Sequence, residues 1–121
     1  MMNNDTIKLI VPNKKDYLSI IRLTASAIAS KLGFNIEEVE DVKVLMGEAS
    51  ILTLCSENTN QLEIEFKIDE KALEILIKLD GELKKEMLDK KEVEMSKMII
   101  ESLADEVDYS KNSIKLTKLI N

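Results

Sequence analysis

Hydrophobic and polar residues alternate near the start of the chain, and the period then lengthens. Between residues 6 and 11 every second residue is apolar, which is typical of a β-strand with one buried face. Pro12 ends this run, because proline has no amide hydrogen for a strand ladder. Over residues 16–32 apolar side chains recur three and four positions apart, which predicts an amphipathic helix that ends at Gly33.

A second helix is expected to begin after Asn35 and to end near Cys55. Asn35 and Glu38 have the spacing of a capping box, in which each side chain accepts a hydrogen bond from the other residue's backbone amide. The first half of this helix is amphipathic. The second half, from Val44 onward, is apolar on nearly every side apart from Glu48, which is typical of a buried central helix.

Two alternating runs follow at residues 62–68 and 73–79. The short turn between them, at residues 69–71, predicts an antiparallel hairpin. The stretch from residue 80 to residue 91 is mostly charged, and we expect a loop or a short exposed helix there.

The last part of the chain predicts one more helix and one more strand. Apolar residues from Met95 to Val107 recur at helical spacing, and residues 114–117 alternate. We interpret Met95 and Met98 as core packing, with a partner-facing surface as the alternative. The order β-α-α-β-β-α-β predicts an α+β two-layer sandwich, a mixed four-stranded sheet with three helices on one face, within a single domain over residues 1–121.

Composition and charge exclude several classes of function. The net charge is −6 and Arg22 is the single arginine, so neither nucleic acid nor an anionic membrane surface is an expected partner. The chain has no long apolar run, its polar start at residues 1–5 does not resemble a secretion signal, and Cys55 is the single cysteine. These features predict a cytoplasmic protein. Without histidine, the usual zinc ligand sets and histidine-dependent nucleophiles are excluded, and we expect no metal site.

Glu48 is the residue that departs most from the pattern around it. Its helical neighbours are all apolar, so its carboxylate is either desolvated with a raised pKa or faces a cavity, as general bases commonly do. The alternative is a structural glutamate that reaches solvent or pairs with a lysine. We expect Glu48 to be kept for structure.

Several segments of the chain, taken in order, carry a resemblance to a known family. They are Val11-Pro12, Asp16-Tyr17, Ile20 to Thr24, Ala29 to Gly33, Glu40 to Lys43, the expected hairpin, Glu101 to Val107 and Lys115 to Lys118. Together these segments resemble the RsbW-like anti-sigma-factor serine kinases of bacteria, and no single short motif is diagnostic. The resemblance covers nearly the whole chain except residues 80–96, and it implies the histidine-kinase-like (GHKL) ATPase fold, a sheet backed by helices.

The first nucleotide motif of that family, Glu-Ala-x-x-Asn, matches this chain in part. The resemblance implies that its glutamate is the catalytic base and that its asparagine helps to hold magnesium. Here Glu48 and Ala49 match, whereas Leu52 stands at the asparagine position and offers no oxygen to a hard cation. The expected base is therefore kept and the expected metal ligand is absent.

The second motif, Asp-x-Gly, implies an adenine-binding aspartate at position 79. The chain reads Leu79-Asp80-Gly81, so the glycine is kept and the acid moves by one position, which in a strand is the opposite face. Asp80 could still reach the site if the strand ends early. Asp80 and Gly81 are therefore the candidate remnants of a nucleotide pocket.

The third motif is a glycine-rich stretch, whose backbone amides approach phosphates. The corresponding residues here are Glu92 to Met95, which are bulky and negative, and the preceding lid is short and charged. The family uses ATP and magnesium. For this chain we expect neither as a cofactor.

Three functions remain open from the sequence. The leading one is a degenerate anti-sigma-factor-like regulator that binds a sigma factor, an anti-anti-sigma protein or both, without phosphoryl transfer. The others are an atypical serine kinase using Glu48 and Asp80, and a module that dimerises with itself or with an intact kinase paralogue. The resemblance implies that Arg22 contacts the sigma factor. The alternative is a surface arginine whose stem covers the edge of an apolar stripe or that pairs with a carboxylate.

Overall fold

A computed structural model describes residues 4–120; the first three residues of the polar start lie outside the described part. Within it, strands and helices follow one another in ten elements. They are β1 Asp5–Pro12, the 3-10 helix η1 Lys15–Tyr17, α1 Leu18–Lys31, α2 Ile36–Cys55, β2 Gln61–Ile68, β3 Ala72–Leu79, α3 Lys85–Leu88, α4 Lys91–Leu103, β4 Glu106–Tyr109 and β5 Ser113–Leu119.

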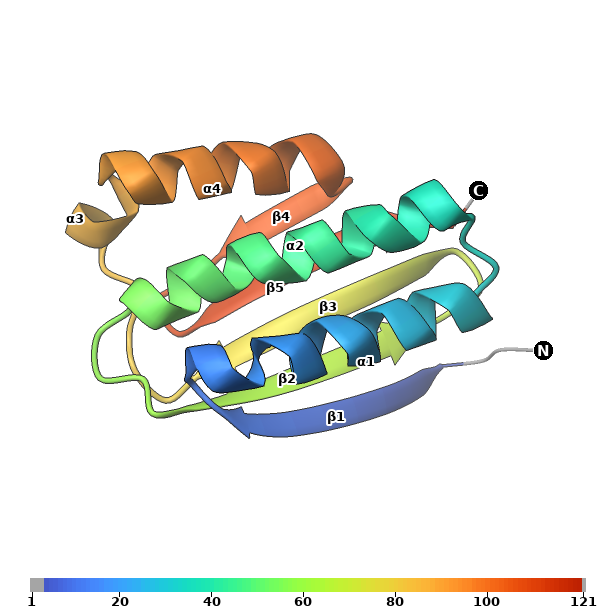
Figure 1. The fold of residues 1–121 in the computed structure, drawn as a ribbon, viewed down its shortest axis with the longest axis horizontal. Coiled ribbons are helices and arrows are strands. Elements are labelled where there is room, and N and C mark those ends of the chain that lie inside the picture. Colours follow the sequence, from blue (N-terminus) through green and yellow to red (C-terminus); the bar gives the residue numbers. More distant parts are fainter. Residues whose placement is uncertain (1–3, 121) are drawn as a thin grey trace.

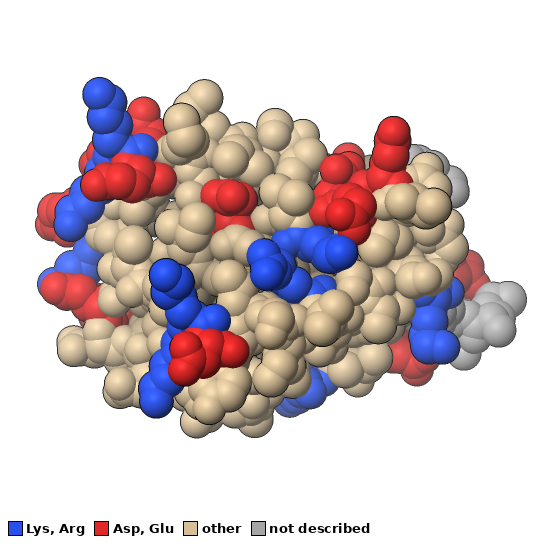
Figure 2. Space-filling model, viewed as in Figure 1, with Lys and Arg blue, Asp and Glu red and all other residues tan. Residues whose placement is uncertain are grey.

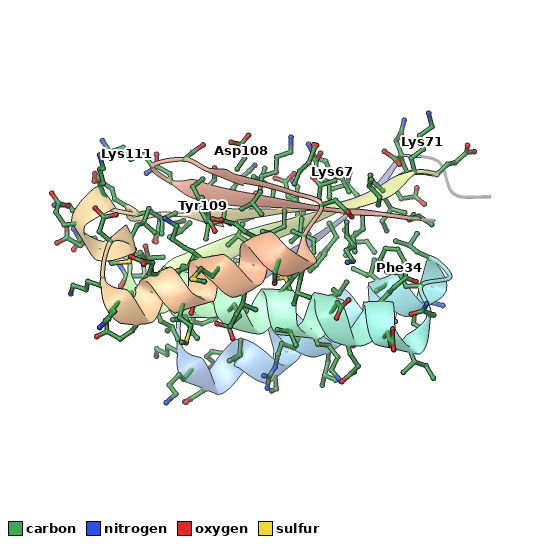
Figure 3. All side chains as sticks on the ribbon, turned by 90° about the horizontal axis from the view of Figure 1, so that it is seen from above. Phe34, Lys67, Lys71, Asp108, Tyr109 and Lys111 are labelled. Carbon is green, nitrogen blue, oxygen red and sulfur yellow. The ribbon has the colours of Figure 1, made fainter. Side chains whose placement is uncertain are left out.

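The strands form one sheet in the order β1-β2-β3-β5-β4, and every neighbouring pair is antiparallel. The long helices α1, α2 and α4 lie side by side on one face of this sheet (Figures 1 and 3). The α+β sandwich with helices on one face is thus confirmed. The sheet itself differs from the expected mixed, four-stranded one: the described strands number five, and none of their pairings is parallel.

The additional strand, β4, replaces the expected end of the third helix. Val107 lies four residues after Leu103, so its position suits a helix as well as a strand. The helix α4 nevertheless ends at Leu103, because the next residues pair with β5. The backbone amide of Asp105 donates to the Thr117 carbonyl over 2.9 Å, and the Asp105 carboxylate accepts the Leu119 amide over 2.7 Å.

Local signals fix the end of α1 and the start of α2 where the sequence predicts them. At the start of α2 the Asn35 side chain accepts the Glu38 amide over 2.8 Å, and the Glu38 side chain accepts the Asn35 amide over 2.8 Å. The capping box is therefore confirmed. After α1, Gly33 takes a left-handed φ of +85°, which favours glycine, and the Phe34 amide returns to the Ala29 carbonyl over 3.3 Å.

The core lies between the helices and the inner face of the sheet. Alternate residues of β2, β3 and β5 point inward, and they meet one face of the central helix α2. Each large side chain buried there contributes roughly 1.5–3 kcal/mol to folding. The largest fully buried side chains include Leu45, Met46, Leu52, Ile64, Phe66, Leu73, Ile75, Ile77, Ile100, Ile114 and Leu116.

The outer face of the sheet carries charges instead. Asp108 and Lys67 lie on this open side, whereas Tyr109 lies on the side of the helices (Figure 3). The helices are all too short or too polar, within the described residues, to cross a membrane.

Candidate functional site

A groove of about 470 Å³ lies between α1 and α2 on the outer surface of the helix layer. Helix α1 contributes Arg22 and Leu23 to it. Helix α2 contributes residues three and four apart, which share one side of a helix. The residues that line the groove are Ser19, Arg22, Leu23, Glu40, Lys43, Val44, Gly47 and Glu48.

Arg22 is the free cation of this groove. Its side chain is exposed and makes no ion pair with any residue from 4 to 120. Lys43, the other cation, is held by Glu40 at 2.9 Å between Nζ and Oε2. Arg22 lies against Gly47. A Cβ added at Gly47 would stand 3.8 Å from both Cδ and Nη1 of Arg22. The guanidinium can therefore pair with a carboxylate of another protein.

Glu48 lines the same groove and is partly exposed. Its carboxylate is therefore not enclosed in the core, and both a base that faces a cavity and a structural glutamate that reaches solvent stay predictions. The expectation that this half of α2 is buried on nearly every side is wrong, because its outer residues Val44, Ile51 and Leu54 are exposed. Apolar residues on both sides of a helix gave no sign of which side the sheet would cover.

Leu52, at the position of the implied metal ligand, is completely buried in the core. Its side chain holds no oxygen, and magnesium requires oxygen ligands. Among residues 4–120, no group of three or more acidic, cysteine or histidine side chains is placed to hold a metal ion.

Asp80 follows directly after β3, at the point where the strand ends. Its Oδ1 accepts the backbone amides of Asn60 at 2.8 Å and Gln61 at 3.2 Å, so it anchors the chain at the start of β2. The structure therefore gives Asp80 a structural role, and it brings Asp80 together with neither Arg22 nor Glu48 in the groove.

Gly81 is buried against the loop that follows α2. A Cβ there would collide with the Glu57 carbonyl oxygen and with Asn58. Glu57 and Glu82 exchange two backbone hydrogen bonds of 2.9 and 2.8 Å, and Asn112 Nδ2 donates to the Gly81 carbonyl over 2.9 Å. The loop backbone thus occupies the space beside this glycine.

The region of the third motif forms the first turn of α4, from Lys91. Glu92 and Glu94 are exposed there, and Val93 is buried. The preceding segment folds inward and buries Leu83 and Met87, and α4 packs directly on α2. Among the described residues, the three motif positions therefore present a buried leucine, a carboxylate with one oxygen bound to two backbone amides, a glycine packed against a loop, and two exposed carboxylates.

The element order and the helix-backed sheet are those of an α+β sandwich and are consistent with the histidine-kinase-like fold that the sequence implied. No family model matches the chain. The serine-protein kinase RsbW of Listeria monocytogenes is 32% identical over 140 residues, which cover 98% of this chain and 89% of that protein. RsbW of Halalkalibacterium halodurans is 25% identical over 136 residues, covering 96% and 84% of the two chains.

The chain therefore belongs to the RsbW serine-protein kinase family. RsbW of Bacillus subtilis is 36% identical over 87 residues, 68% of this chain, and in this match the chain spans only 54% of that kinase. Similarly, it spans about half, 52%, of RsbW of Bacillus licheniformis. The Listeria alignment, at 140 positions, is longer than the 121 residues of this chain, so that kinase carries residues that have no counterpart here.

Proposed function

We propose that this protein is an anti-sigma-factor-like regulator that acts in the cytoplasm by binding other proteins, without ATP turnover. Its partners are a sigma factor, an anti-anti-sigma protein or both, which are the partner classes implied by the family. The observation that carries the proposal is the groove between α1 and α2, where the unpaired Arg22 lies open to solvent beside Glu48.

The absence of turnover rests on the three motif positions. Leu52 is buried and cannot hold magnesium, Asp80 binds backbone amides, and Gly81 is packed against the Glu57 carbonyl. Glu92 and Glu94 would repel a triphosphate. Each lost charge-assisted contact is typically worth about 1.5–3 kcal/mol, and a millimolar dissociation constant corresponds to only about 4 kcal/mol.

A serine kinase remains the second candidate function, because one observation favours it. Glu48, the expected base, is partly exposed and lines an open groove rather than the core. A hydroxyl of a bound partner could reach it there.

Titration calorimetry with magnesium ATP tests the proposal. We expect the dissociation constant for ATP to be millimolar or weaker, which corresponds to a binding free energy of roughly 4 kcal/mol or less in magnitude. Leu52→Asn alone should not restore binding, since the packing around Gly81 and the charges of α4 remain. Micromolar ATP binding, together with phosphorylation of an anti-anti-sigma protein that Glu48→Gln abolishes in a folded variant, would establish the kinase instead. Sedimentation of the protein alone and with an RsbW kinase tests the dimerisation alternative.

A further inference from the structure

Two methionines stand out on the surface of α4. Met95 and Met98 are 67% and 65% exposed, although their helical spacing suggested core packing. The opposite side of the helix supplies the core contacts instead, through Val93, Ser96 and Ile100. An amphipathic period indicates that one face of a helix is buried, and here the methionines fall on the other face. We call these two residues the methionine ridge.

The side of α4 opposite the methionine ridge is packed against the rest of the protein. Val93, Ser96 and Ile100 are buried, and α4 packs on α2 and over β4, where Lys97 Nζ stands 5.7 Å from the centre of the Tyr109 ring. The backbone that presents the ridge is therefore fixed, and the methionine side chains on it are flexible. Flexible thioethers adapt to different apolar partners, and methionine is common at binding surfaces that accept several partners.

Carboxylates border the ridge. Glu92 is three residues before Met95, Glu94 is four before Met98, and Glu101 is three after Met98, so each is a surface neighbour of a methionine. None of these carboxylates forms an ion pair within residues 4–120. Among the residues three or four positions from Met95 or Met98, Lys91 is the one that carries a positive charge. The border is therefore negative overall.

We propose that the methionine ridge is a docking surface for an amphipathic helix of a partner protein, one whose apolar stripe is bordered by lysines or arginines. The apolar stripe packs on Met95 and Met98, and the basic border pairs with Glu92, Glu94 and Glu101. The proposal does not rest on the Arg22 groove, which lies between α1 and α2. Figure 2 shows the molecule from the side of the helices, where wide uncharged areas separate a few groups of charges.

The test uses three synthetic peptides of about 18 residues, five helical turns. The first is an amphipathic leucine–lysine helix, the second has the same composition in scrambled order, and the third replaces lysine with glutamate. The protein carries ¹³C-methyl methionine, and its six methionine methyl signals are assigned by substitution. We expect the first peptide to shift the signals of Met95 and Met98, and the other two peptides to shift neither.

Variants locate the binding surface. The pair Met95→Gln and Met98→Gln should weaken binding of the first peptide by roughly tenfold or more. Replacing Glu92, Glu94 and Glu101 by glutamine should reduce both the affinity and its dependence on salt. Ile36→Gln is the matched control, because Ile36 is an apolar side chain 84% exposed at the far end of α2. This control variant should bind the first peptide as tightly as the wild type does.

Three outcomes would overturn the proposal. The first is equal binding of the amphipathic and scrambled lysine peptides, which would indicate attraction to net charge alone. The second is unchanged affinity in the double glutamine variant, or the absence of any shift at Met95 and Met98. The third is a shift of these two signals with protein concentration before any peptide is added, which would assign the ridge to a second copy of this chain.

Discussion

Arg22 of α1 lies across Gly47 of α2, and the absence of a side chain at Gly47 leaves room for the guanidinium in the groove. A Cβ at residue 47 would stand 3.8 Å from both Cδ and Nη1 of Arg22, which is ordinary van der Waals contact. The two residues are far apart in the sequence, and the packing of α1 on α2 brings them together. A methyl group thus fits beside Arg22, and a larger side chain would meet the Arg22 side chain first.

Gly47→Ala should stabilise the protein. Glycine in the interior of a helix is about 0.8–1 kcal/mol less favourable than alanine, and the space beside Arg22 accepts a methyl group. Urea denaturation should therefore give a free energy of unfolding higher by roughly 0.5–1 kcal/mol. Gly47→Leu is the companion variant: it should fold, displace Arg22 and weaken partner binding. A less stable alanine variant would contradict the packing described here.

Arg22→Ala should weaken binding of the sigma factor or anti-anti-sigma partner by about 2 kcal/mol or more, the usual threshold for an interface hot spot. Arg22→Lys should recover little, since lysine lacks the planar fork that pairs bidentately with carboxylates. Thermal stability should change little, because Arg22 makes no ion pair among the described residues. Lys43→Ala is the matched control in the same groove, because Lys43 already pairs with Glu40. Equal affinities of the Arg22→Ala variant and the wild type would remove this residue from the interface.

Gly81→Ala should destabilise the fold severely. The new Cβ would meet the Glu57 carbonyl oxygen, which accepts the Glu82 amide. The Glu57 amide in turn donates to the Glu82 carbonyl, so two hydrogen bonds hold this backbone in place. Overpacking of this kind costs about 1–3 kcal/mol and occasionally more. Urea denaturation should be compared for Gly81→Ala and Gly47→Ala. Both substitutions add one methyl group, but we expect the first to lower the free energy of unfolding and the second to raise it. Similar stabilities of the two variants would show that the loop after α2 yields easily.

Glu65 should make stability depend on pH in the acid range. Its buried carboxylate pairs with Lys78 on the outer face of the sheet, and this hydrogen bond holds the pKa of Glu65 below its usual value. Because the pKa is lower in the folded state, the stabilisation is present above the unfolded value, about 4.3, and is lost as pH falls through the folded pKa.

The variant Glu65→Gln tests this linkage. It should be less stable than the wild type at neutral pH, and the difference should narrow as the pH falls below about 4. Urea denaturation at several pH values gives the free energy of unfolding of the wild type and of Glu65→Gln. Glu70→Gln, at an exposed turn position, is the control and should follow the wild type. A constant difference between Glu65→Gln and the wild type at every pH would mean that the glutamine acts through packing alone.

Tyr109→Phe should stabilise the protein, because the Tyr109 hydroxyl is buried without a hydrogen-bond partner among residues 4–120. Removing an unsatisfied hydroxyl recovers about 1 kcal/mol or more. Burial, with the nearby Glu101 carboxylate, raises the pKa of Tyr109 to about 12. The pKa of Tyr109 is higher in the folded state than in the unfolded state, where it is about 10. The stability contributed by the neutral hydroxyl is therefore fully present below about pH 10 and is lost as the pH rises toward the folded-state pKa.

The advantage of Tyr109→Phe should therefore grow above about pH 10, where the unfolded wild-type chain begins to ionise. Urea denaturation at neutral and alkaline pH compares the two proteins. Tyr17→Phe, at the end of η1, is the control for the loss of a tyrosine hydroxyl elsewhere. If Tyr109→Phe is less stable than the wild type at neutral pH, the Tyr109 hydroxyl has a hydrogen-bond partner, and this prediction is wrong.

The order of the long elements could be predicted from the sequence, because it rests on local patterns. Two-residue alternation marks β1, β2, β3 and β5, and capping residues mark the ends of α1 and α2. The segment-by-segment resemblance also pointed to the family to which the chain belongs. The positions of Leu52, Asp80 and Gly81 were known from the same motifs.

What surrounds those residues was decided by the tertiary structure. The four residues of β4 form a strand only because β5 lies beside them, and Asp80 turns to the amides of Asn60 and Gln61 across the chain. The exposure of Met95 likewise depends on which face of α4 meets α2. A periodic pattern records that a helix has an apolar side, whereas long-range pairing and packing decide which side chains are covered. For the same reason, only the packing of α1 on α2 could place Arg22 and Glu48 in one groove.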